Sequence, residues 1–295
     1  MLATLLKTTR PAFLLLTLVL IALAAGLAVY HGHVIEPHLV GLVLFGALCA
    51  HAGVNVLNEV HDAASGLDEL TTRTPFSGGS GALQAHPEAQ RSAAIFGWLL
   101  IAVVVLLGCY FVYLRGWELL PFGLVGLVLV IAYTPLITRL PWLCLFAPGL
   151  GFGPIMMGGA YLVITGNLTF AVLAVSLVPF LLVNNLLLLN QLPDVEADRQ
   201  VQRNNVITAY GFKTASKIYR GFLVSAFLGL GLLVAVEELP PLVWISFATL
   251  PIAVWLYLGV RRLRTPHPIP ASLLALNVAL TLSVPALMVT ALLLT

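Results

Sequence analysis

The chain has 295 residues, of which 60% are hydrophobic and only 9% are charged, and its formal net charge is +2. A soluble globular domain normally carries about 25% charged residues, so this composition excludes an ordinary soluble domain and favours a chain that is embedded in lipid. The near-neutral charge gives no reason to expect a nucleic-acid partner.

Nine apolar segments follow one another along the chain, each close to the roughly 20 residues that a helix needs to cross a bilayer. They cover about 11–30, 38–58, 92–113, 118–136, 142–164, 169–192, 215–235, 240–260 and 271–294. We therefore predict an all-α fold, a polytopic membrane bundle of about nine transmembrane helices around a central cavity. Residues 1–295 are expected to form a single transmembrane domain.

The basic residues indicate how the bundle is oriented. If the N-terminus lies inside, Arg115 is the one member of the 14 Lys and Arg residues that falls on the outer side. Basic connections mark the cytoplasmic face of a membrane protein. We therefore expect a multi-pass protein of the cell (inner) membrane, with the N-terminus and two long polar connections, 59–91 and 193–214, in the cytoplasm.

The first long connection opens with the pattern N-x-x-x-D at a membrane edge. Asn58 and Asp62 are four residues apart and share a helix face. Asp68 comes six residues later, about 240° around a straight helix. It can rejoin the same site only if the helix ends near Gly66 and the chain turns back, which a glycine permits.

The second long connection repeats the pattern. Asn190, Asp194 and Asp198 follow the sixth apolar segment at four-residue spacing, so we predict that they form one stripe on a helix. With the predicted topology, both patterns lie on the same side of the membrane.

Carboxylates that converge at a membrane edge repel one another and need a compensating cation. Oxygen ligands suit a hard ion such as Mg²⁺, which typically bridges carboxylates to substrate phosphates. We therefore predict a magnesium site with the aspartates as catalytic residues; its ligands are Asn58, Asp62, Asp68, Asn190, Asp194 and Asp198.

Arginines lie close to both patterns. Arg73 follows the first, and Arg199 and Arg203 follow the second, where they could neutralise the oxygens of a departing diphosphate. The alternative is that these side chains are ordinary cytoplasmic anchors.

These residues together resemble the UbiA superfamily of intramembrane prenyltransferases. The resemblance covers nearly the whole chain and includes the nine segments, the two Asp-rich motifs and the opening pair Arg10-Pro11. It implies an enzyme that uses Mg²⁺ to ionise a polyprenyl diphosphate and lets an aromatic ring attack the resulting carbocation.

The spacing of the first motif is similar to one branch of that superfamily. Hydroxybenzoate prenyltransferases usually show D-x-x-x-D, whereas five residues separate Asp62 from Asp68 here, with Gly66 between them. This gap resembles the 1,4-dihydroxy-2-naphthoate polyprenyltransferases of menaquinone biosynthesis.

Three departures from the family pattern leave the acceptor open. Glu59 stands where the branch tends to have Asp, Arg203 keeps a positive charge while a nearby glycine and threonine are lost, and Leu145 replaces an acidic residue. A hydroxybenzoate or another aromatic or lipid acceptor therefore remains an alternative.

The resemblance also implies roles for other polar residues. Arg139 could contact the diphosphate or an acceptor carboxylate, Tyr133 could stabilise an allylic cation through its ring face, and Arg10 could hold an acceptor carboxylate. Each could instead belong to the membrane interface. His61 is a candidate proton acceptor, although a satisfied interior histidine is the simpler interpretation.

A divalent-cation transporter is the alternative from another class. Transporters place ionisable groups or broken helices near the middle of the bilayer. Here the aspartates lie at the membrane edge, and the indications of a broken helix are confined to the fifth segment, at 151–154, Gly-Phe-Gly-Pro, and at Gly158-Gly159.

Overall fold

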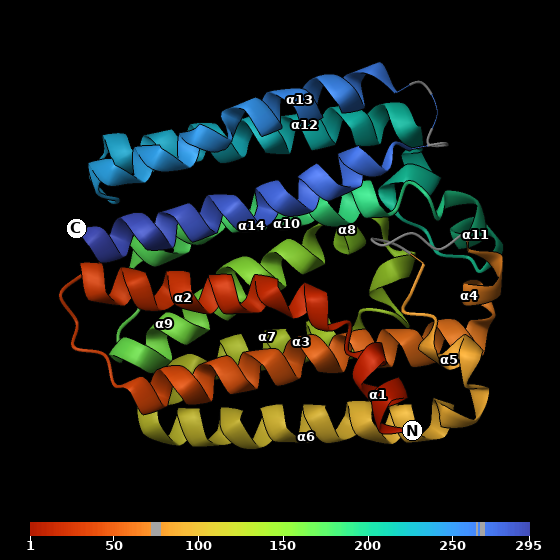
Figure 1. The fold of residues 1–295 in the computed structure, drawn as a ribbon. Coiled ribbons are helices and arrows are strands. Elements are labelled where there is room, and N and C mark those ends of the chain that lie inside the picture. Colours follow the sequence, from red (N-terminus) through yellow and green to blue (C-terminus); the bar gives the residue numbers. More distant parts are fainter. Residues whose placement is uncertain (72–77, 264, 266–268) are drawn as a thin grey trace.

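The computed structural model describes residues 1–71, 78–263, 265 and 269–295, with only the backbone of Asp68 and Glu69. Within these residues the regular elements are all helical, which confirms the predicted fold class. Figure 1 shows the long helices running side by side, with the C-terminus at the end of the bundle opposite α4, α5 and α11.

The helices have these bounds, in chain order: α1 Leu2–Thr8, η1 Pro11–Leu14, α2 Leu15–Tyr30, α3 Pro37–Ser65, α4 Leu67–Leu70, α5 Ala82–Ala85, η2 Pro87–Ala89, α6 Gln90–Arg115, η3 Trp117–Leu119, α7 Leu120–Ala132, η4 Ile137–Arg139, α8 Pro141–Leu150, η5 Gly151–Met157, α9 Gly158–Thr165, α10 Phe170–Asn190, α11 Val195–Gln200, α12 Val206–Ala235, η6 Pro241–Thr249, α13 Leu250–Arg262 and α14 Ala271–Leu294.

Eight helical segments in the described part of the chain are long and apolar enough to cross a membrane. The fourth predicted span, 118–136, is shorter than expected. Its helical part is Trp117–Ala132, about 24 Å at 1.5 Å per residue, against a hydrocarbon core of roughly 30 Å. The described part of the chain is thus a multi-pass bundle of eight long helices and one short apolar helix.

The fifth span is helical but irregular, because α8 passes through the π-helical turn η5 before α9. Pro154 inside this turn has no N–H to donate to the preceding turn. Two glycines let α10 approach closely: Gly149 donates its N–H to Asn184 Oδ1 (2.7 Å), and Gly153 lies against the carbonyl of Ser176. The segment 151–154 therefore marks a π-helical turn packed on a neighbouring helix.

Polar side chains hold α10, α12 and α14 together inside the bundle. Asn185 donates to the carbonyl of Tyr219 (2.9 Å), the Tyr219 hydroxyl donates to Asn277 Oδ1 (2.9 Å), and Asn277 donates back to the carbonyl of Asn185 (3.2 Å). Asn184, which bonds α8, and Asn185 both serve helix packing, as interhelical amides commonly do in membranes.

Arg115, the exception to the charge asymmetry, caps a helix. It donates to the carbonyls of Val163 (2.7 Å) and Ile164 (3.3 Å) in the last turn of α9. A cation there satisfies free carbonyls and interacts favourably with the helix dipole.

Candidate active site

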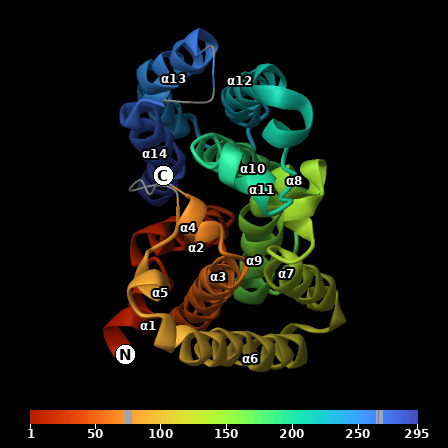
Figure 2. The same ribbon diagram turned by 90° about the vertical axis from the view of Figure 1, so that its right-hand side faces the viewer.

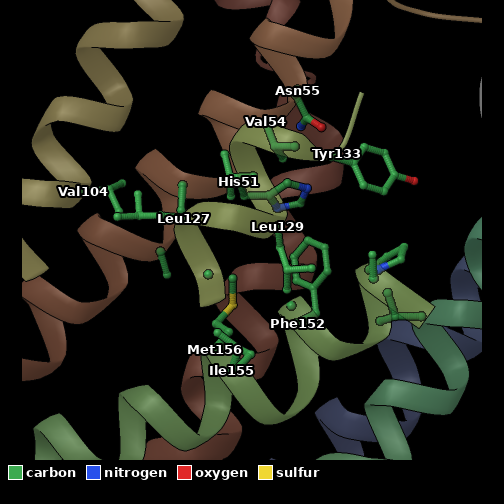
Figure 3. A pocket seen from close by; sticks show the side chains of 18 of the residues that line it. His51, Val54, Asn55, Val104, Leu127, Leu129, Tyr133, Phe152, Ile155 and Met156 are labelled. Atoms are coloured by element: carbon green, nitrogen blue, oxygen red, sulfur yellow. The ribbon is translucent and has the colours of Figure 1, made fainter. Parts of the chain in front are cut away.

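A cavity of about 1140 Å³ runs through the bundle between α3, α6, α7, the α8–α9 segment and α10. Along α3 its lining extends from Val43 to Asp62, which corresponds to about 28 Å of helix. Most of the wall is apolar. Figure 3 shows His51, on this wall, close to Leu129 and Phe152. Its Nδ1 bonds Thr17 Oγ1 (2.8 Å), so it is a satisfied interior histidine.

Asn58 and Asp62, near the C-terminal end of α3, form a group that we call the first acidic corner; Asn190, Asp194 and Asp198 form the second. The helix stops at Ser65, and Gly66 takes a left-handed conformation (φ 73°) before α4 begins. The chain thus reverses direction at Gly66, as the sequence predicted. This reversal places α4 in contact with α11, which carries part of the second corner. Asn58 and Asp62 line the cavity, whereas the Asp68 side chain lies outside the described residues.

The second corner differs from the predicted continuous stripe. α10 ends at Asn190, a turn spans 191–194, and α11 then starts at Val195. The interruption coincides with Pro193, which cannot donate a backbone hydrogen bond. Asn190, Asp194 and Asp198 nevertheless all line the cavity, because the turn leaves all three side chains on the side that faces the cavity. In Figure 2 α11 lies at the end of the bundle that faces the viewer, as α4 does.

Arg203 joins the two corners. Its Nη2 donates to Asp62 Oδ1, and its Nη1 lies 3.9 Å from Asp198 Oδ1. Asn205 supports this arrangement from the start of α12: its Oδ1 accepts from the N–H groups of Ile207 and Thr208, and its Nδ2 donates to Asp198 Oδ2 (2.8 Å). Asn205 was not among the predicted site residues, although an Asn just before an apolar helix is a typical N-cap.

Two oxygens at the second corner have no partner among the described residues. Asn190 Oδ1 and Asp194 Oδ1 are both buried and form no hydrogen bond. Burial, with the neighbouring Asp198 charge, raises the pKa of Asp194 to about 7; burial, opposed by Arg203, raises that of Asp198 to about 6. Unpaired buried oxygens are costly, and oxygen donors of this kind are what a hard cation such as Mg²⁺ prefers. The described residues do not include a group of three or more His, Cys, Asp or Glu side chains already placed to hold a metal ion.

Comparison with known proteins identifies the family. A profile of the UbiA prenyltransferase family matches residues 18–291. The chain belongs to this family. It is therefore a prenyltransferase, which sets aside the transporter alternative. A search of curated proteins found no match.

Solved UbiA homologues have the same fold. One from Archaeoglobus fulgidus, bound to DMAPP and Mg²⁺, superimposes with a TM-score of 0.70 at 15% identity, covering 99% of this chain and 100% of that one. One from Aeropyrum pernix K1 gives 0.71 at 15% identity, with 93% and 97% coverage. A structure concerned with digeranylgeranylglyceryl phosphate synthase gives 0.70 at 15% identity, with 100% and 99% coverage.

The remaining predicted site residues divide into three groups. Arg10 and Tyr133 line the cavity, although Arg10 already pairs with Glu59. The side chains of Arg139, Arg199 and His61 are exposed and do not line the cavity as the structure describes it; Arg199 pairs with Glu196 at the surface (3.0 Å). These three predicted contacts therefore gain no support from their placement. Arg73 lies outside the described residues.

Proposed function

We propose that this protein transfers a polyprenyl group from polyprenyl diphosphate to an aromatic acceptor, with 1,4-dihydroxy-2-naphthoate in menaquinone biosynthesis as the favoured acceptor. The observation that carries this proposal is the meeting of two acidic corners, joined by Arg203, at the end of a long apolar cavity. The polar end suits a diphosphate bound through a cation, and the apolar wall suits an isoprenoid tail.

The proposed cofactor is Mg²⁺, which supplies positive charge that stabilises the diphosphate as it leaves. Asp62, Asp194 and Asp198, with the amide oxygen of Asn190, would hold it, and the orphaned oxygens of Asn190 and Asp194 fit that role. Asn58 and Asp68 complete the proposed ligand set. Asn58 already bonds Arg10 (3.4 Å) and Thr134 (3.2 Å), so in this arrangement it also orients its neighbours.

The chain's own residues carry the rest of the mechanism. Arg203 can exchange its carboxylate partners for diphosphate oxygens, where its charge helps the leaving group depart. The Tyr133 ring, on the cavity wall, can face the allylic cation. The apolar wall excludes water, which would otherwise capture that cation before the acceptor ring attacks.

The choice of acceptor rests on the spacing between Asp62 and Asp68. The test is a panel of dihydroxynaphthoate, hydroxybenzoate, homogentisate and a glyceryl phosphate lipid, each incubated with purified protein, Mg²⁺ and polyprenyl diphosphate. We expect acceptor-dependent pyrophosphate release and a prenylated dihydroxynaphthoate product by mass spectrometry. Product with another acceptor alone would overturn the naphthoate assignment, and no acceptor-dependent release with any of them would overturn the proposed transfer to an aromatic ring.

We further propose that the protein lies in the cell inner membrane as one transmembrane domain, with its N-terminus and both acidic corners in the cytoplasm. The charge asymmetry supports this orientation. It is tested by labelling a cysteine introduced near Met1 in intact cells with a membrane-impermeant reagent. Labelling there before lysis would contradict the proposed orientation.

A further inference from the structure

Glu59 is a buried acid beside the first motif to which the proposed chemistry gives no role. Its relative exposure is 1%. The carboxylate accepts four hydrogen bonds, from Arg10 Nε (2.7 Å), Arg10 Nη2 (2.5 Å), the Ser80 N–H (2.7 Å) and the Ser80 hydroxyl (2.6 Å). Both oxygens are thus engaged, and the buried negative charge has a cationic partner, as such a charge requires.

The backbone of Arg10 has an unusual conformation that contacts of its side chain help to maintain. Arg10 has φ 51° and ψ 66°, in the left-handed region, directly before Pro11. A non-glycine residue rarely adopts this conformation, and it persists where surrounding contacts impose it. The two hydrogen bonds to Glu59 supply such contacts. A further one fixes the preceding residue, because Asn55 Nδ2 donates to the carbonyl of Thr9 (2.9 Å).

The second segment that Glu59 binds is the turn that contains Ser80. Ser80 lies between glycines with positive φ, 74° at Gly79 and 74° at Gly81, so the chain turns sharply on both sides of it. Gly78 and Gly79 line the cavity. The Ser80 hydroxyl also accepts from the N–H of Ala82 (3.1 Å), which connects this turn to the start of α5.

We propose that Glu59 is a positioning residue that fixes two segments against α3 at the rim of the cavity: Arg10 with the chain before α2, and the Gly78–Gly81 turn. Glu59 thereby sets the wall beside Asn58 and Asp62, where the substrate diphosphate would bind. The effect on catalysis rests on the proposed function, whereas the effect on the two segments does not.

The structural part is tested by amide hydrogen exchange on the full-length protein in detergent. Glu59→Gln should speed exchange in the peptide that covers 78–85 by about tenfold or more, since the Ser80 N–H loses an ionised acceptor. Glu36→Gln, at the exposed start of α3, serves as the matched control and should change nothing. Ser80→Ala removes the hydroxyl's hydrogen bonds to Glu59 and from the Ala82 N–H but leaves the buried charge paired with Arg10, so it keeps the test available if Glu59→Gln folds poorly. Unchanged exchange in a folded variant would overturn the proposal.

The catalytic part is tested by a double-mutant cycle. Glu59→Gln and Arg10→Gly should each lower kcat/KM by about tenfold or more, and the double variant should lose little beyond the worse single variant. Arg10→Gly relieves the left-handed backbone while deleting the side chain, so full activity in it would show that the side chain is dispensable and would contradict the proposal. Effects that multiply would also contradict it. If the wild type transfers no prenyl group but Glu59→Gln still frees 78–85, the proposed function fails and the positioning of this segment stands.

Discussion

Arg203 links the two acidic corners. It contacts Asp62 at the end of α3 and lies near Asp198 in α11, so it partly offsets the repulsion between these carboxylates. In the proposed mechanism its guanidinium would also make a planar interaction with the diphosphate. Under the proposal, one side chain would therefore serve both to pair the two corners and to bind the diphosphate.

This arrangement predicts opposite effects of Arg203→Gln on two ligands. Diphosphate should bind about tenfold or more weakly, because it loses a charge-assisted hydrogen bond, whereas Mg²⁺ alone should bind at least as well, because a competing cation is gone. Calorimetric titrations of each ligand measure both. Arg199→Gln is the control, since Arg199 is exposed and pairs only with Glu196 among the described residues. Equal losses in both variants would contradict the role of Arg203.

The raised pKa values of Asp194 and Asp198, about 7 and about 6, predict a pH dependence of metal binding. A carboxyl group must lose its proton to bind Mg²⁺, so affinity should rise with pH and binding should release protons near neutrality. Between about pH 6 and about pH 8 we expect roughly a twentyfold gain in affinity if both carboxylates are ligands. Titration calorimetry in buffers with different ionisation enthalpies measures both effects, and an affinity independent of pH would argue against these carboxylates as ligands.

At the scale of the helices, the close approach of α8 to α10 is the most demanding contact. A Cβ on Gly149 would lie 2.3 Å from Asn184 Oδ1 and 2.4 Å from the Phe180 carbonyl, both of them far inside contact distance. Gly149→Ala should therefore cost about 1–3 kcal/mol of stability and displace the wall of the cavity. Gly41→Ala, where a Cβ meets nothing within 4 Å, should not destabilise the protein. Thermal unfolding in detergent compares the two, and equal melting temperatures would contradict the tight packing.

The apolar spans and the two acidic motifs could be predicted from sequence because they depend on local composition and spacing. The π-helical turn at 151–157 and the break after Asn190 could not, since a proline marks each position without defining the geometry that neighbouring helices allow. The hydrogen-bond partners of Glu59 could not be predicted from the sequence either. Arg10 lies 49 residues before it and Ser80 lies 21 residues after it, and no periodicity connects such distant positions.

At the scale of the whole molecule, the bundle brings chain segments from two distant regions to one end of one cavity. The first corner ends α3 and the second follows α10, and α4 meets α11 between them. The first corner offers Asn58 and Asp62 and the second offers Asn190, Asp194 and Asp198, so a site that used ligands from both would form only where the two regions of the bundle are packed together. This dependence makes one cation-binding site shared by both corners the central claim.

The most direct test is the binding of Mn²⁺, as a paramagnetic substitute for Mg²⁺, in the presence of a non-hydrolysable prenyl thiolodiphosphate, followed by electron paramagnetic resonance. Wild-type protein should bind the ion, whereas Asp62→Asn in the first corner and Asp194→Asn in the second should each weaken binding by about tenfold or more while remaining folded. If either variant binds Mn²⁺ as tightly as the wild type, the two corners do not share the site.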